Sequence, residues 1–66
     1  MSDIKYPDIE VQLSGGDGNA MAIIAPVARA IRDAQGPEAA SVFADEAMPA
    51  DYDNVLQIAM RWVDVS

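Results

Sequence analysis

The stretch from Asp8 to Arg32 changes from a two-residue apolar period to a helical one, with a glycine cluster between the two patterns. A period of two predicts a strand with one buried face, and spacings of three and four predict a helix with one buried side. A strand and one helix cannot enclose a core alone, so the remaining chain must pack against them. The sequence therefore predicts a mixed fold that starts with a strand.

The predicted strand begins at Asp8 and ends at Ser14. Its buried face carries Ile9, Val11 and Leu13, and its other face is polar. Residues 1–7 follow no apolar period and end at a proline, so we expect an N-terminal tail there. Residues 8–66 form a single small predicted domain.

Residues 14–19 form a glycine-rich turn in which Asp17 or Asn19 can cap the following helix. A glycine cluster between a strand and a helix also suggests a phosphate-binding loop. However, Met21 stands where the dinucleotide fingerprint has its third glycine, and the loop lacks the lysine of a P-loop. We therefore expect a turn and no cofactor.

The first predicted helix runs from about Asn19 to Ala34. Its apolar side consists of Met21, Ile24, Val27, Ala28 and Ile31. Pro26 lies past the first turn and leaves the Ala22 carbonyl without its amide partner, so we predict a helix kinked at Pro26. Two shorter helices are the alternative.

Gly36 and Pro37 separate this helix from a second one over residues 37–48, since Gly36 suits a left-handed cap and Pro37 a first helical position. Its apolar side consists of Ala39, Ala40, Val42, Phe43 and Ala47. We expect Glu38, Asp45 and Glu46 to face water.

Asp51 caps a third predicted helix, after the break at Pro49. Its broad apolar stripe consists of Tyr52, Val55, Leu56, Ala59, Met60, Trp62 and Val63. Asp51, Asp53 and Asn54 resemble the start of a calcium loop, but the central glycine and distal glutamate are missing, so we interpret them as capping residues.

The predicted fold class is α+β and mainly helical, with one N-terminal strand followed by three short helices (β-α-α-α). A lone strand needs a hydrogen-bonding partner. Two solutions are open: antiparallel pairing with the same strand of a second copy, or pairing with Val63 to Val65 of the same chain. We predict a homodimer, because the internal candidate is short and helical continuation competes for it.

The amino-acid composition argues against most hydrolytic and redox chemistry. The chain has no Cys and no His, so it lacks thiolate metal ligands, a thiol nucleophile and the commonest general base. We expect no catalytic residue, no cofactor and no metal. The longest apolar run, Ala20 to Ala28, is shorter than the roughly 20 residues that span a bilayer, and the N-terminus lacks signal-peptide features. We therefore expect a cytoplasmic protein without membrane contact.

The formal net charge of −7 argues against nucleic-acid binding, which depends on neutralising phosphates. Four acids, at positions 17, 38, 51 and 53, fall at predicted helix starts, where they cap the helix or favour its dipole. Without these four the surface is ordinary for a soluble protein. A protein partner fits this balance better than a nucleic acid.

Five segments of the chain form one pattern. In chain order they are Tyr6-Pro7, residues 9–15, residues 17–20, Asp51-Tyr52-Asp53 and residues 60–63. Together they resemble a family of small proteins of unknown function encoded by actinobacteria and their phages. Pro26 departs from the family pattern. The resemblance implies a bacteriophage or actinobacterial setting and brings no activity, cofactor or catalytic residue.

We predict a non-enzymatic small interaction protein, phage-encoded or phage-derived, that binds a host or phage protein. The candidate interaction residues are Ile9, Val11, Leu13 and Trp62, on the strand face and the last helix. The alternatives are an acidic DNA mimic and a ribbon-helix-helix-like regulator. The outward strand face of such a regulator would here present Asp8, Glu10, Gln12 and Ser14 to DNA. An enzyme would need paired carboxylates in a pocket that 66 residues can hardly enclose.

Overall fold

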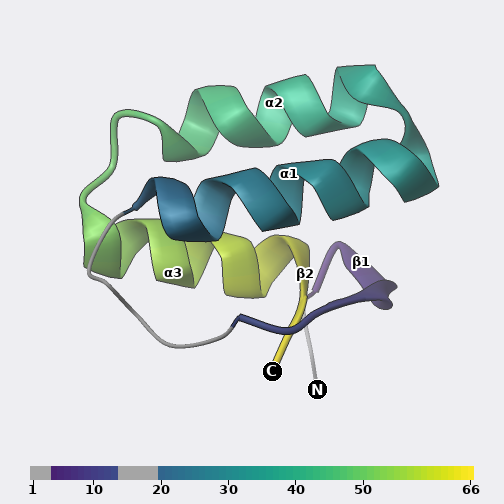
Figure 1. Cartoon of the computed structure of the whole chain (residues 1–66), viewed down its shortest axis with the longest axis horizontal. Coiled ribbons are helices and arrows are strands. Elements are labelled where there is room, and N and C mark those ends of the chain that lie inside the picture. Colours follow the sequence, from purple (N-terminus) through teal and green to yellow (C-terminus); the bar gives the residue numbers. More distant parts are fainter. Residues whose placement is uncertain (1–3, 14–19) are drawn as a thin grey trace.

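The computed structural model describes residues 4–13 and 20–66. These residues form a small, mainly helical α+β fold (Figure 1) with one N-terminal strand, three helices and a short second strand. The elements follow the order β1 (Tyr6–Val11), α1 (Met21–Gln35), α2 (Pro37–Ala47), α3 (Tyr52–Trp62) and β2 (Val63–Val65). The predicted fold class is confirmed, with β2 as the additional element.

Strand β1 pairs with β2 in parallel, so the strand finds a partner within its own chain. A parallel pair needs a long connection between its strands, and here the three helices provide it. Residues 63–65 form β2 instead of continuing α3, and Val63 is fully buried in this strand. The homodimer stays a prediction, but pairing of β1 no longer requires one.

The predicted strand boundaries are wrong at the N-terminal end, because β1 begins at Tyr6 and not at Asp8. The Lys5 amide donates to the Arg61 carbonyl at 2.8 Å, which places this segment beside the end of α3. The register is irregular between Tyr6 and Glu10, so Pro7 lies where the ladder is interrupted. A proline is tolerated at such a position because no ladder bond needs its missing amide. The strand ends at Val11, and the predicted end at Ser14 lies outside the described residues.

Helix α1 is continuous through Pro26, so the alternative of two shorter helices is wrong. Ala22 and Pro26 are both exposed, and water can therefore solvate the Ala22 carbonyl that lacks an amide partner. A bend of the helix axis at Pro26 stays a prediction. Capping of α1 by Asp17 or Asn19 lies outside the described residues; the N-cap position is Ala20, which makes no side-chain capping bond.

Gly36 separates α1 from α2, as the sequence predicted. Its amide donates to the Arg32 carbonyl at 2.9 Å. Its φ of 98° and ψ of 167° fall in a part of the φ/ψ map that is essentially limited to glycine, and not in the left-handed helical conformation that we expected. Pro37 occupies the start of α2, where its missing amide costs nothing.

In the view of Figure 1, α1 is drawn between α2 and α3, with the strands beside them; α3 also contacts α2 directly, so the three helices pack around a shared core. The core is entirely apolar among the described residues. It consists of Ile9, Val11, Ile23, Ile24, Val27, Ile31, Ala40, Phe43, Ala47, Val55, Ala59, Trp62 and Val63. Val42 and Met60, which we predicted on buried stripes, are each 52% exposed. Both lie at the margin of an apolar stripe, where a rotation of the helix by part of a turn decides burial.

Candidate functional site

The predicted interaction residues are part of the core of the chain. Ile9, Val11 and Trp62 are 8%, 5% and 6% exposed, and Leu13 is half-buried against the same core. Their side chains are already packed against neighbours. A partner could therefore reach β1 only through its backbone edge and its outward face.

Trp62 is the centre of a cluster that we call the Trp62 junction, which joins three separate parts of the chain. The rings of Phe43 and Tyr6 lie 5.5 and 5.9 Å from the Trp62 ring, measured between centroids. The indole Nε1–H donates to Glu46 Oε1 at 2.8 Å. The Lys5 ammonium lies 4.4 Å from the ring centroid, in a cation–π position. The junction consists of Lys5, Tyr6, Phe43, Glu46 and Trp62.

The contacts of the junction give the buried Trp62 side chain both apolar neighbours and a polar partner. An indole N–H that enters a core needs an acceptor, and Glu46 provides it from the surface of α2. Sequence reasoning placed Glu46 in water and missed this bond, because the two residues are far apart in the chain. The available signal was the indole N–H of Trp62, which needs a hydrogen-bond acceptor when the ring is buried.

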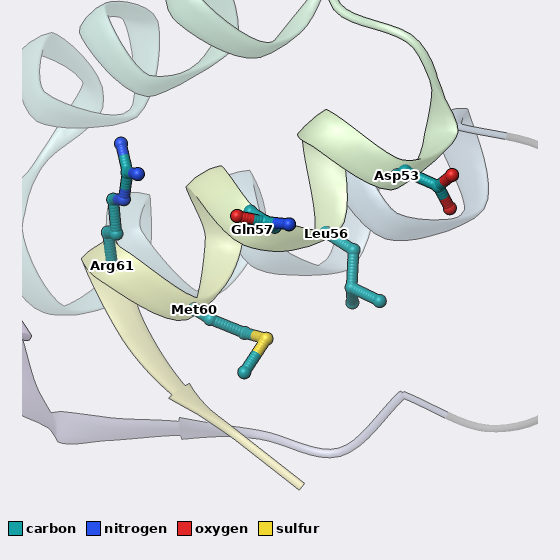
Figure 2. Close-up of a pocket in the computed structure, with 5 residues that line it drawn as sticks. All are labelled: Asp53, Leu56, Gln57, Met60 and Arg61. Atoms are coloured by element: carbon teal, nitrogen blue, oxygen red, sulfur yellow. The ribbon is translucent and has the colours of Figure 1, made fainter.

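The opposite side of α3 carries a shallow groove of about 540 Å³, which we call the α3 patch. The described residues that line it are Asp53, Leu56, Gln57, Met60 and Arg61. Their spacings of three and four residues place them on one side of the helix. Figure 2 shows Leu56 and Met60 projecting from one flank of this side, with Asp53 and Arg61 at its two ends.

The charged and apolar residues of the α3 patch follow one another along the helix. An acid stands at the N-terminal end, a base at the C-terminal end, and apolar side chains lie between them. The two ends are about 12 Å apart along the helix axis, from the rise of an α-helix. No ion pair joins either charged side chain to another residue in the described part of the chain. Among the described residues, the patch therefore carries one charge of each sign that no ion pair occupies.

A third surface is the edge of β1 that faces away from β2. The Ser66 amide donates to the Val11 carbonyl at 3.0 Å, and the Leu13 amide donates to the Ser66 carbonyl at 3.2 Å. Peptide groups alternate in direction along a strand, so those of Glu10 and Gln12 face the opposite edge. The sheet has two strands in the described ranges, and none pairs with that edge.

Among the described residues, no three acids lie close enough together to hold a metal ion. Asp51 Oδ1 accepts the amide of Asn54 at 3.0 Å, which confirms that Asp51 caps α3, and Asp53 lies in the first turn of the helix. The glycine cluster that was weighed as a phosphate loop lies outside the described ranges. None of the described helices has the length and apolar character to cross a membrane.

The strand pairing also differs from the ribbon-helix-helix plan. That plan pairs the strands of two copies antiparallel, whereas here β1 pairs in parallel with β2 of the same chain. Comparison with known proteins adds no relative: no protein-family model matches the chain, and neither a curated protein nor a solved structure is detectably similar to it.

Proposed function

We propose that this chain is a small non-enzymatic interaction protein that binds an extended segment of a host or phage protein. The segment would pair as an additional strand with the edge of β1 that faces away from β2. The observation that carries the proposal is the pair of outward-facing peptide groups at Glu10 and Gln12. Strand addition uses such groups for affinity and the alternate side chains for specificity. The phage setting rests on the sequence resemblance alone.

The charge of this edge defines the chemistry of the partner. Asp8, Glu10 and Gln12 are exposed on the outward face, and two of the three are acidic. Opposite charges on neighbouring strands stabilise a pair, and like charges directly opposite destabilise it. A segment with Lys or Arg at alternate positions therefore fits this edge better than a second acidic copy of the chain.

Pro7 limits the length of the added strand. It has no amide to donate and lies in the irregular part of the register. The usable edge therefore runs from Glu10 toward Leu13, which is short. A short edge indicates weak, transient binding, unless another surface contributes.

The test uses a synthetic peptide in which Val and Lys alternate, with binding measured by titration calorimetry at two salt concentrations. Two further peptides separate hydrogen bonding from charge: one has Glu in place of Lys, and the other keeps Lys but is N-methylated at alternate residues. We expect the alternating Lys peptide to bind and the other two to bind at least about tenfold more weakly, which corresponds to 1.4 kcal/mol.

Protein variants locate the binding edge. Gln12→Pro removes an outward amide without changing the net charge, and Gln12→Ala is its matched control. We expect the proline variant to lose at least about tenfold in affinity and the alanine variant to bind like the original protein. Equal binding of the N-methylated peptide, or of the proline variant, would show simple charge attraction and contradict strand addition.

A further inference from the structure

We infer that the α3 patch is the contact between two copies of this chain, packed with their α3 helices antiparallel about a two-fold axis near Gln57. The inference goes beyond the proposed function, because it concerns a different surface and a different partner. It also differs from a dimer through β1, since β1 keeps its pairing with β2.

The first argument is the order of charges. A two-fold axis that passes Gln57 and is perpendicular to the antiparallel helices pairs residues that lie equally far before and after position 57. Residue i of one copy is then level with residue 114 − i of the other. Asp53 of each copy then lies at the level of Arg61 of the other along the helix axes, where the long Arg61 side chain can reach it across the contact. The same ion pair therefore forms twice. This self-complementarity is what a two-fold interface requires.

The second argument is the exposed apolar pair. Met60 is 52% exposed although it lies next to the fully buried Ala59, and Leu56 is half-buried one turn before it. The two-fold rotation keeps this flank on the same side in both copies, so each copy adds a Leu56 and a Met60 to one shared apolar contact. Methionine is suited to such a contact because its side chain adapts to irregular surfaces.

The third argument is the balance of charge over the whole molecule. Copies with a formal net charge of −7 each repel one another, so a self-contact needs a face where both signs are present. The α3 patch has one acid and one base, whereas the outward face of β1 has two acids and no base among its described residues. Self-association is therefore favoured at α3 and disfavoured at β1.

The first experiment measures the oligomeric state by sedimentation equilibrium from micromolar to millimolar concentration. We expect a reversible dimer that weakens with salt, because exposed ion pairs are screened. Asp53→Lys and Arg61→Glu should each weaken the dimer by at least about tenfold, because each substitution is present in both copies and changes two ion pairs. The double variant Asp53→Lys/Arg61→Glu should restore dimerisation, because the charges are then exchanged and still complementary.

The second experiment uses the absence of cysteine in the chain. Gln57→Cys places a single thiol near the axis, and a short bis-maleimide should cross-link it into dimers. Val42→Cys is the control, because Val42 is as exposed as Met60 but lies on α2. Circular dichroism must show that each variant keeps its helical content.

Three outcomes would overturn the inference: a monomer at millimolar concentration, a dimer insensitive to both charge reversals, or equal cross-linking at positions 57 and 42. If the protein is a monomer, the α3 patch does not bind a second copy, and its partner would have to be a different protein. These outcomes are distinguishable from failure at β1, because the charge-reversal variants keep the Gln12 edge and can still be titrated with the alternating Lys peptide.

Discussion

The Trp62 junction and the α3 patch lie on two sides of one helix and differ in what they contact. The junction takes side chains from before β1, from β1 and from α2, and its central ring is 6% exposed. The patch takes its described residues from α3 alone, and Met60 is 52% exposed there. Burial on α3 therefore depends on the contacts of distant segments and not on the apolarity of the helix residues.

The comparison separates stability from recognition. Residues of the junction should determine whether the chain folds, whereas residues of the patch should affect association with little effect on folding. Substitutions on the two sides of α3 test this separation.

The largest effect is expected from Trp62→Ala, with a loss of about 3–5 kcal/mol in the free energy of unfolding. The substitution removes the ring contacts with Tyr6 and Phe43 and leaves a cavity between α2, α3 and β1. A domain of this size has a total stability of roughly 3–10 kcal/mol, so the variant should be close to unfolded. Urea denaturation followed by circular dichroism measures the change, with Trp62→Phe as a milder variant. A loss below about 1 kcal/mol would contradict the central role of the ring.

The next effect is expected from Ala59→Met, which places a long side chain on the buried side of α3. Ala59 is fully buried, so overpacking should cost about 1–3 kcal/mol. The measurement is the midpoint of thermal unfolding. A neutral result would mean that the helix rotates to expose this position, and the distinction between the two sides of α3 would then be wrong.

A smaller effect is expected from Glu46→Ala, with a loss of about 1 kcal/mol, because the Trp62 indole N–H loses its acceptor. Asp45→Ala is the matched control: it also removes an acid near the end of α2, and the Asp45 side chain makes no hydrogen bond or ion pair with another described residue. Trp62 is the single tryptophan, so its fluorescence reports directly on the junction. Equal stability and equal emission of the two variants would show that the bond is dispensable.

The smallest effect on folding is expected from Met60→Ala, within about 0.5 kcal/mol, because the side chain is half in water. The same substitution should weaken the proposed dimer, since it removes apolar contact from both copies. Sedimentation and urea denaturation of one preparation measure both quantities. A large loss of stability with an unchanged dimer would reverse the assignment of the two sides.

The sequence determined the local structure. Alternation around Ile9 and Val11 indicated the strand, the Gly36-Pro37 pair marked the break between α1 and α2, and Asp51 caps α3 as predicted. Each of these features depends on residues a few positions apart, whose backbone preferences and hydrogen bonds act within one element.

Only the tertiary structure decided the pairing of β1 with β2, the bond between Trp62 and Glu46, and the exposure of Val42 and Met60. The sequence left two pairing partners open for the strand and placed both Val42 and Met60 on buried stripes. These outcomes depend on how whole elements pack, because a side chain at the margin of an apolar stripe is buried only if a distant segment covers it. Local patterns carry no information on which segment that is.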